Sequence, residues 1–291
     1  MAKRGRASQG RRSNRRALIL LAVVILIAGT LFVVYEYHRY SSVQPPPPPP
    51  PPPEVVQPLP EQPGLPTVPP GHQVVEHTYY VLSYNEECEQ PDWVMYKLQR
   101  RFLQGSARRK DRFRPDPAVI TGSATPKDYR RSGYDRGHLL PAADMKFSPE
   151  AMAETFFMSN MSPQAPQFNR GIWKKLEEQV REWCKREGEL YVVTGPVLQE
   201  QLPRIGENKV CVPRYYYKIV LDYEEPEIKA IAFVMENRKL PGNIFDYAVP
   251  IDSVEALTGL DFFAPLPDSF EDSLEATINP APWKALLARR N

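Results

Sequence analysis

The most distinct pattern in the sequence is an uncharged apolar run near its start. Residues 17–35 read ALILLAVVILIAGTLFVVY and are followed by the first acid, Glu36. As a helix that rises about 1.5 Å per residue, the run is roughly 28 Å long, which matches the hydrocarbon thickness of a bilayer. The pattern predicts one transmembrane helix. A secretory signal peptide is the alternative, although no small-x-small cleavage site precedes Glu36.

A proline-rich stretch follows the apolar run. Residues 45–53 are an unbroken series of prolines. Because proline fixes φ and lacks an amide donor, this series predicts a stiff polyproline II rod of roughly 28 Å. We interpret residues 36–71 as a spacer that holds a domain away from the membrane. A ligand for a proline-recognising domain is the alternative.

Strand-like and helix-like patterns alternate in the rest of the chain. Runs rich in aromatic and β-branched residues predict strands at 78–84, 190–195, 214–223 and 228–237. Apolar residues at helical spacing predict the clearest helix at 171–186, and we also expect a helix at 92–103. A short helix should start at Pro149, after the capping residue Ser148. Because there is no regular βαβ alternation, the pattern favours an α+β fold over a doubly wound sheet.

Charge is distributed unevenly along the chain. Residues 1–53 hold eight of the 37 basic residues and one of the 35 acids, so residues 54–291, with 29 basic and 34 acidic residues, have a net charge of −5. The basic N-terminus, residues 1–16, should stay on the cytoplasmic side, which places the remainder across the membrane. Overall charge therefore gives no argument for nucleic-acid binding, and such an argument depends on local patches.

Two local patches along the chain have charges of opposite sign. Residues 97–114 contain eight basic side chains and one acid, Asp111, whereas acids dominate residues 221–275. Either patch could be a solvated face.

The three cysteines have no close-spaced metal motif and allow at most one internal disulfide, whose pairing the sequence leaves open. They are Cys88, Cys184 and Cys211.

His138, in the stretch DRGH, is the only histidine well inside the globular part, since His38 lies beside the apolar run and His72 and His77 lie at the domain's entry. A single histidine is often structural, but Arg136 can pair with phosphate and Asp135 can orient the ring. Further along, Asn169 opens the strong helix, where asparagine is a common N-cap. Its side-chain oxygen also suits Mg²⁺, which keeps several waters and often takes one or two protein oxygens. Glu177 lies about 12 Å further along that helix, so we expect it to reach the ion through water or to be an exposed acid.

Residues 131–177 resemble the signature region of the DNA/RNA non-specific endonuclease family, which includes mitochondrial endonuclease G and secreted bacterial nucleases. DRGH is followed by S-N-x-x-P-Q from Ser159, by F-N-R-G-x-W from Phe168 and then by L-E. Later stretches follow in the family's order. The resemblance therefore covers roughly residues 72–275.

The resemblance implies a ββα-metal core, in which a β-hairpin and a helix hold one hydrated Mg²⁺, or Mn²⁺ in its place, beside a mostly antiparallel sheet flanked by helices. It implies that His138 is the general base, that Asn169 is the metal ligand and that Glu177 orders the metal's waters. Arg136 matches an arginine of the motif. Asn160 matches a polar residue that supports the site.

The resemblance also implies what the site acts on. The expected reaction is hydrolysis of DNA and RNA to products with 5′-phosphates, through backbone contacts and without sequence readout. Family members use an upstream arginine to hold the scissile phosphate, for which Arg112 and Arg109 are the candidates. Members are often homodimers. The alternatives are a catalytically silent domain that binds or takes up DNA at the cell surface and an adaptor that acts through the polyproline rod.

These observations predict five parts of the chain: a basic cytoplasmic N-terminus (1–16), a transmembrane helix (17–35), a Pro-rich linker (36–71), a nuclease domain (72–275) and a C-terminal tail (276–291). A bacterial inner membrane with the nuclease on the periplasmic side is the expected location, because it separates the nuclease from the genome. The mitochondrial inner membrane is the alternative, since arginine-rich, acid-free N-termini also occur in transit peptides.

Overall fold

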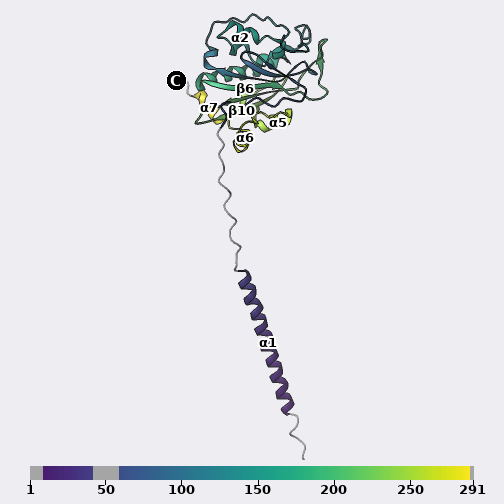
Figure 1. Ribbon diagram of the computed structural model, residues 1–291, viewed down its shortest axis with the longest axis vertical. Coiled ribbons are helices and arrows are strands. Elements are labelled where there is room, and N and C mark those ends of the chain that lie inside the picture. Colours follow the sequence, from purple (N-terminus) through teal and green to yellow (C-terminus); the bar gives the residue numbers. More distant parts are fainter. Residues whose placement is uncertain (1–8, 42–58, 289–291) are drawn as a thin grey trace, which may run out of the picture. The chain divides into compact units, whose positions relative to one another are not determined.

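The computed structural model describes residues 9–41 and 59–288, in two separate units (Figure 1). The described residues of the first unit form one helix, α1 (Gln9–Ser41). Its segment Ala17–Tyr40 contains an 18-residue window with a mean hydropathy of 3.1. It is long and apolar enough to cross a membrane, a property that anchors and signal sequences share. The expected polyproline rod, residues 45–53, lies outside the described residues.

The second unit is built on a seven-stranded sheet. Its strand order is β1-β2-β3-β6-β9-β10-β11, and every neighbouring pair is antiparallel. The strands are β1 (Gln73–Glu76), β2 (Tyr80–Asn85), β3 (Gln90–Gln99), β6 (Glu189–Pro196), β9 (Tyr215–Asp222), β10 (Lys229–Glu236) and β11 (Ala248–Val249). The expected α+β fold with an antiparallel sheet is therefore confirmed, as are the four expected strands, which correspond to β2, β6, β9 and β10.

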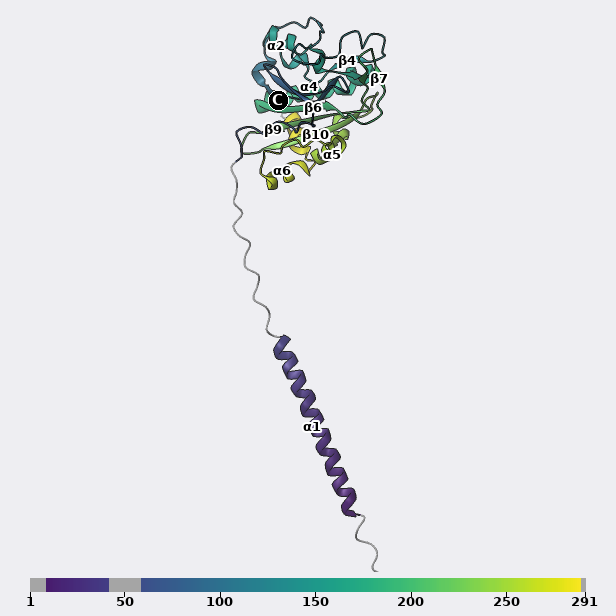
Figure 2. The same ribbon diagram turned by 45° about the vertical axis from the view of Figure 1, so that its right-hand side comes forward.

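Both faces of the sheet are covered, as Figures 1 and 2 show. Alternate residues of β9 point to opposite faces: Tyr216 and Val220 join one core, whereas Tyr217 and Ile219 join the other. The first core contains side chains of α2 (Pro149–Glu154), α4 (Lys174–Glu187) and α7 (Ala281–Ala288). The second contains side chains of α5 (Ile251–Thr258), with α6 (Asp268–Glu275) packed against it.

The helix expected at 92–103 is wrong. Residues up to Gln99 belong to strand β3, and only a short 3-10 helix, η1 (Arg100–Leu103), follows. Trp93 packs into one core and Val94 into the other, so the strand is buried on both faces. A strand that is covered on both sides has no alternation of polar and apolar residues, and its sequence can be mistaken for that of a buried helix.

The other expected helices are present, with one shift. Ser148 caps α2 by accepting hydrogen bonds from the N–H groups of Glu150 and Ala151. The strong helix starts at Lys174 and not at Gly171, because Gly171 has non-helical angles (φ −102°, ψ −114°). A short helix α3 (Pro166–Phe168) and an irregular turn, η4 (Asn169–Trp173), precede it.

Both ends of the second unit pack against its body. Trp283, in the segment expected to be a tail, is fully buried, and its carbonyl accepts a hydrogen bond from the indole of Trp183 at 3.0 Å. At the other end, the indole of Trp93 donates to the carbonyl of Thr67 at 3.0 Å. Thr67 lies in the segment that we assigned to the linker, so the compact unit includes part of that segment.

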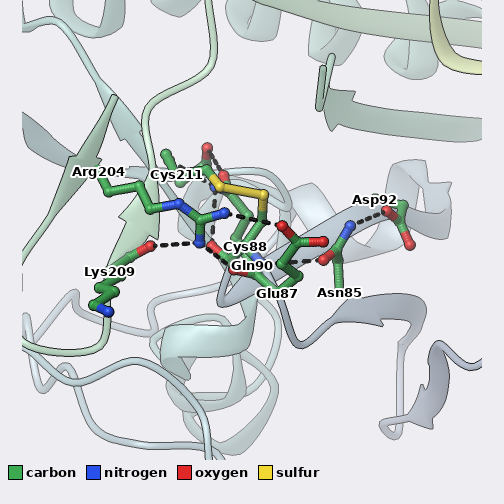
Figure 3. Close-up of a disulfide and its surroundings, with 9 residues drawn as sticks. Asn85, Glu87, Cys88, Gln90, Asp92, Arg204, Lys209 and Cys211 are labelled. Carbon is green, nitrogen blue, oxygen red and sulfur yellow. Dashed lines mark hydrogen bonds and ion pairs between the residues drawn. A yellow bond between two sulfur atoms is a disulfide. The ribbon is translucent and has the colours of Figure 1, made fainter. Parts of the chain in front are cut away.

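A disulfide joins Cys88 to Cys211, across 123 positions of sequence (Figure 3). It links the turn before β3 to β8 (Val210–Cys211), which pairs with β7 (Arg204–Ile205). The side chain of Gln90 reinforces this link by donating to the carbonyl of Cys211 at 2.7 Å. Cys184 is a free, buried thiol, and its burial raises its pKa to about 12.

Candidate active site

The DRGH motif forms a β-hairpin outside the large sheet. Strand β4 (Asp135–His138) pairs antiparallel with β5 (Met161–Gln164), and His138 lies opposite Met161. Gly137, in the middle of β4, leaves room for the side chain of Gln164, which a Cβ at this position would hit. A larger residue directly before the histidine would therefore have to displace the buried side chain of Gln164.

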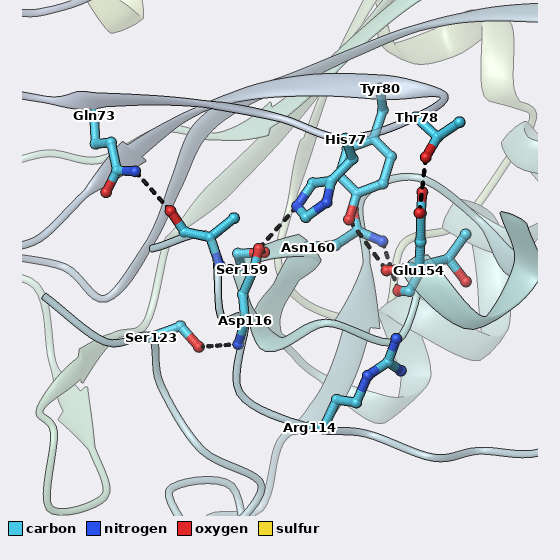
Figure 4. Close-up of polar contacts among 12 residues, drawn as sticks. Gln73, His77, Thr78, Tyr80, Arg114, Asp116, Ser123, Glu154, Ser159 and Asn160 are labelled. Atoms are coloured by element: carbon cyan, nitrogen blue, oxygen red, sulfur yellow. Dashed lines mark hydrogen bonds and ion pairs between the residues drawn. The ribbon is translucent and has the colours of Figure 1, made fainter. Parts of the chain in front are cut away.

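Asn160 holds the loop that follows His138. It is fully buried in the 3-10 helix η3 (Met158–Asn160), and its side chain makes hydrogen bonds to both backbone polar groups of Leu140. Its neighbour Ser159 donates to Asp116, which also accepts a hydrogen bond from His77 at 2.8 Å (Figure 4). This polar network joins the start of the domain to the hairpin.

Asn169 has a fixed side-chain orientation at the start of η4. Its Nδ2 donates to Asp135 Oδ2 at 2.9 Å, and Arg170 donates to the same carboxylate at 2.8 and 2.6 Å. Among the described residues, no donor reaches Oδ1 of Asn169 with a hydrogen bond. This oxygen is therefore available to a ligand.

A cleft of about 770 Å³ collects most of the predicted site residues. Its lining includes His138, Arg136, Asn169, Glu177 and Arg109. The two remaining candidates are not part of the lining. Asn160 is buried behind the loop, and Arg112 lines a separate hollow with Arg108, Lys110 and Arg114.

The ring of His138 lies between two aromatic side chains. Phe156 contacts it edge-on with centroids 4.8 Å apart, and Phe113 lies 5.6 Å away. Among the described residues, its Nε2 has no hydrogen-bond partner. Burial, followed by the positive charge of Arg109, lowers the pKa of His138 from its ordinary value of about 6.5 to about 3. The imidazole is therefore neutral throughout the physiological pH range.

Glu177 lines the cleft beside a group of buried charges. Burial raises its pKa to about 7, while the positive charges of Lys218 and Arg181 oppose the rise. Lys218 is fully buried, with its ammonium 5.0 Å from the centre of the Trp173 ring. Burial lowers the pKa of Lys218 to about 8.

Sequence reasoning missed Arg181, which also lines the cleft. It follows Glu177 by four positions on α4, so the two side chains lie on the same face of the helix. Its guanidinium donates to Asp144 at 2.8 Å, and Asp144 accepts a further hydrogen bond from Tyr96 at 3.0 Å. The four-residue spacing from Glu177 is the sequence signal that could have identified it.

The donor set of the cleft fits a hard divalent cation. Such ions take oxygen ligands, often one or two from the protein with waters completing the shell. Asn169 Oδ1 is a neutral oxygen whose amide is oriented by Asp135, and the carboxylate of Glu177 lines the same cleft. Asn169 would hold the ion, and Glu177 would accept hydrogen bonds from its waters.

Comparisons with known proteins show the family of the chain. The family model for the DNA/RNA non-specific endonuclease matches residues 62–269. A nuclease from Nostoc sp. is 35% identical over 222 residues, which cover 72% of this chain and 80% of that protein. The mitochondrial nuclease EXOG from Danio rerio is 37% identical over 207 residues, which cover 65% of this chain and 60% of that protein.

A solved structure supports the same assignment. A crystal structure of the EndoG/EndoGI complex matches with a TM-score of 0.63 and 33% identity, and the match covers 67% of this chain and 87% of that one. Human mitochondrial endonuclease G is 36% identical over 208 residues, covering 65% of this chain and 69% of that protein. The chain is a nuclease and belongs to the DNA/RNA non-specific endonuclease family.

Proposed function

We propose that the protein is a membrane-anchored, Mg²⁺-dependent endonuclease that hydrolyses DNA and RNA without sequence preference and leaves 5′-phosphates. The main support is that His138 and Asn169 line one cleft, the first as a neutral base and the second with a free, oriented amide oxygen. The names of the relatives, endonuclease G and EXOG nucleases, agree with this class of reaction.

Each of these side chains has a separate role in the proposed hydrolysis. His138 takes a proton from the attacking water, which a neutral imidazole can do. Arg136 and Arg109 donate hydrogen bonds to the phosphate oxygens and compensate the charge that grows on them in the transition state. A bound Mg²⁺ supplies Lewis-acid stabilisation of the phosphate and of the departing 3′ oxygen. Glu177 orients water near Asn169.

The charge of the cleft favours a polyanionic substrate. Five Lys and Arg side chains line it, against three acids. The basic members are Arg109, Arg136, Arg170, Lys174 and Arg181. Guanidinium groups bind phosphates in any sequence context, so a cleft of this kind recognises the backbone of DNA or RNA and not the bases.

We place the nuclease domain outside the cytoplasm. The apolar helix α1 follows a basic N-terminus, and the disulfide between Cys88 and Cys211 is of a kind that persists in oxidising compartments. A bacterial inner membrane with a periplasmic domain meets both conditions, and so does a mitochondrial inner membrane. Both a bacterial protein and mitochondrial proteins are among the relatives. The homodimer stays a prediction.

A plasmid assay tests the proposal. The full-length protein in detergent should nick and linearise supercoiled plasmid with Mg²⁺, degrade single-stranded RNA, and lose both activities in EDTA. End-labelling before and after phosphatase treatment should show 5′-phosphates. A protein that binds plasmid equally well with and without Mg²⁺ and never cuts it would favour the catalytically silent alternative.

A further inference from the structure

A group of three carboxylates lies between two helices on the sheet face opposite to α4. Asp252 and Glu255 belong to α5, and Glu275 is the last residue of α6. One oxygen from each lies within 4.8 Å of the others. Figures 1 and 2 both show α5 and α6 on one side of β10, with α2 on the other side. The group lies in the acidic stretch 221–275, which the nuclease cleft does not use.

Of the three carboxylates, Glu275 is the one whose burial is least favourable without a bound ligand. Its side chain is 5% exposed, and its Oε1 is buried without a hydrogen-bond partner among the described residues. Glu271, one turn earlier on α6, also has a buried, unpartnered Oε1. A buried carboxylate without a partner is strongly unfavourable, because it loses its hydration and gains nothing in return.

Nothing described around the group offers a compensating positive charge. No Lys, Arg or His nitrogen of the described residues lies within 4.0 Å of Asp252, Glu255 or Glu275. The group therefore concentrates negative charge where the protein itself does not neutralise it.

The spacing of these oxygens suits one calcium ion. Ca²⁺ binds six to eight oxygens at about 2.3–2.6 Å, so two of its ligands can be at most about 5 Å apart. A hydrogen bond from the Phe262 N–H to Glu255 Oε1, at 3.0 Å, orients one of the three carboxylates. Asp252 is exposed, which leaves one side open for waters to complete the shell. Mg²⁺ fits less well, because it demands a near-ideal octahedron.

We propose that Asp252, Glu255 and Glu275 bind one Ca²⁺ in a structural site that is separate from the nuclease cleft. The ion ties α5 to the end of α6 beneath the sheet. It compensates Glu275, whose burial is otherwise unexplained, and so fixes the C-terminal part of the domain.

The test uses the full-length protein in detergent, with Asn169→Ala as the parent so that the cleft does not contribute a second ion. Equilibrium dialysis with ⁴⁵Ca²⁺ should count one bound ion in this parent and none after adding Glu275→Gln. At about 100-fold excess over Kd, Ca²⁺ should raise the parent's Tm by about 5–10 °C. The Glu275→Gln protein should show no rise, and in EGTA it should be at least as stable as the parent, because it lacks one repulsive charge.

Asp272→Asn is the matched control, since Asp272 is an exposed acid on the same helix. This variant should keep the bound ion and the Tm rise. A parent that binds no Ca²⁺, or a Glu275→Gln variant that binds as much as the parent, would overturn the proposal. Plasmid cleavage by the wild type with Mg²⁺ is measured separately, so the test of the nuclease function does not depend on the result for Ca²⁺ binding.

Discussion

Asn160 binds both backbone polar groups of Leu140: its Oδ1 accepts the N–H at 2.9 Å, and its Nδ2 donates to the carbonyl at 3.0 Å. The same Nδ2 also donates to the carbonyl of Thr155 at 2.8 Å. Leu140 is two residues beyond His138, so one buried amide fixes the course of the chain as it leaves the catalytic strand. Asn160 is not part of the lining of the cleft, so we propose that it is a positioning residue.

Replacing Asn160 by Ala should destabilise the protein. The change leaves three buried backbone groups without partners, at a cost of about 2–4 kcal/mol in the free energy of unfolding. Denaturant unfolding of the full chain measures this cost. Asn169→Ala removes the same side chain in the open cleft and should leave the stability nearly unchanged while activity is lost. Equal stability of the two variants would argue against a positioning role for Asn160.

Replacing Asp135 by Asn should weaken the response to Mg²⁺. Asp135 accepts from Asn169 and from Arg170, and a neutral amide cannot hold both donors in the same way. Replacing a residue that orients a metal ligand typically lowers the metal affinity by about 10–100-fold. The half-saturating Mg²⁺ concentration of plasmid cleavage should rise by that factor. Arg170→Gln is the control, since it removes only the exposed partner, and an equal effect there would contradict the argument.

Arg109 and Arg112 should differ in their effect on nucleic-acid binding. Arg109 lines the cleft, whereas Arg112 lines a separate hollow. Each phosphate contact contributes about 0.9 to the slope of log affinity against log salt. Arg109→Ala should therefore reduce this slope by about 0.9, the value of one phosphate contact, and lower the cleavage rate. Arg112→Ala makes the same change in charge and should leave the cleavage rate within a few-fold of the wild type. The reverse order would identify Arg112 as the phosphate-binding residue.

Loss of the disulfide should lower stability more than activity. A cross-link over 123 positions restricts the unfolded chain, and its removal typically costs about 2–5 kcal/mol. The double variant Cys88→Ser, Cys211→Ser should melt at a lower temperature and still cut plasmid at 25 °C, because the disulfide lies outside the lining of the cleft. Dithiothreitol should shift the Tm of the wild type in the same direction and leave the double variant unchanged.

Local signals in the sequence predicted much of the fold. Ser148 before Pro149 marked the start of α2, and the apolar spacing marked α4 to within a few residues. These features depend on neighbours in sequence. Strand β3 was misread because its burial depends on helices that come from distant parts of the chain and cover both faces of the sheet.

The site residues that belong to a sequence motif could be predicted. His138 and Asn169 came from such motifs, and both line the cleft. Arg181 was missed although it follows Glu177 by four positions on α4. Its ion pair with Asp144, 37 residues earlier, could not be predicted, because only the fold brings the two side chains together. Arg109 and Arg112 could not be separated from sequence, since they flank Asp111, whose positive φ of 46° turns the backbone between them.

In the proposed mechanism, the neutral ring of His138 takes the proton of the attacking water. Single-turnover cleavage of a labelled duplex, with His138→Ala beside the wild type, tests it most directly. The rate constant should fall by about 10²–10⁴-fold, while duplex affinity in EDTA and the Tm change little. A variant that cuts at nearly the wild-type rate would contradict the claim.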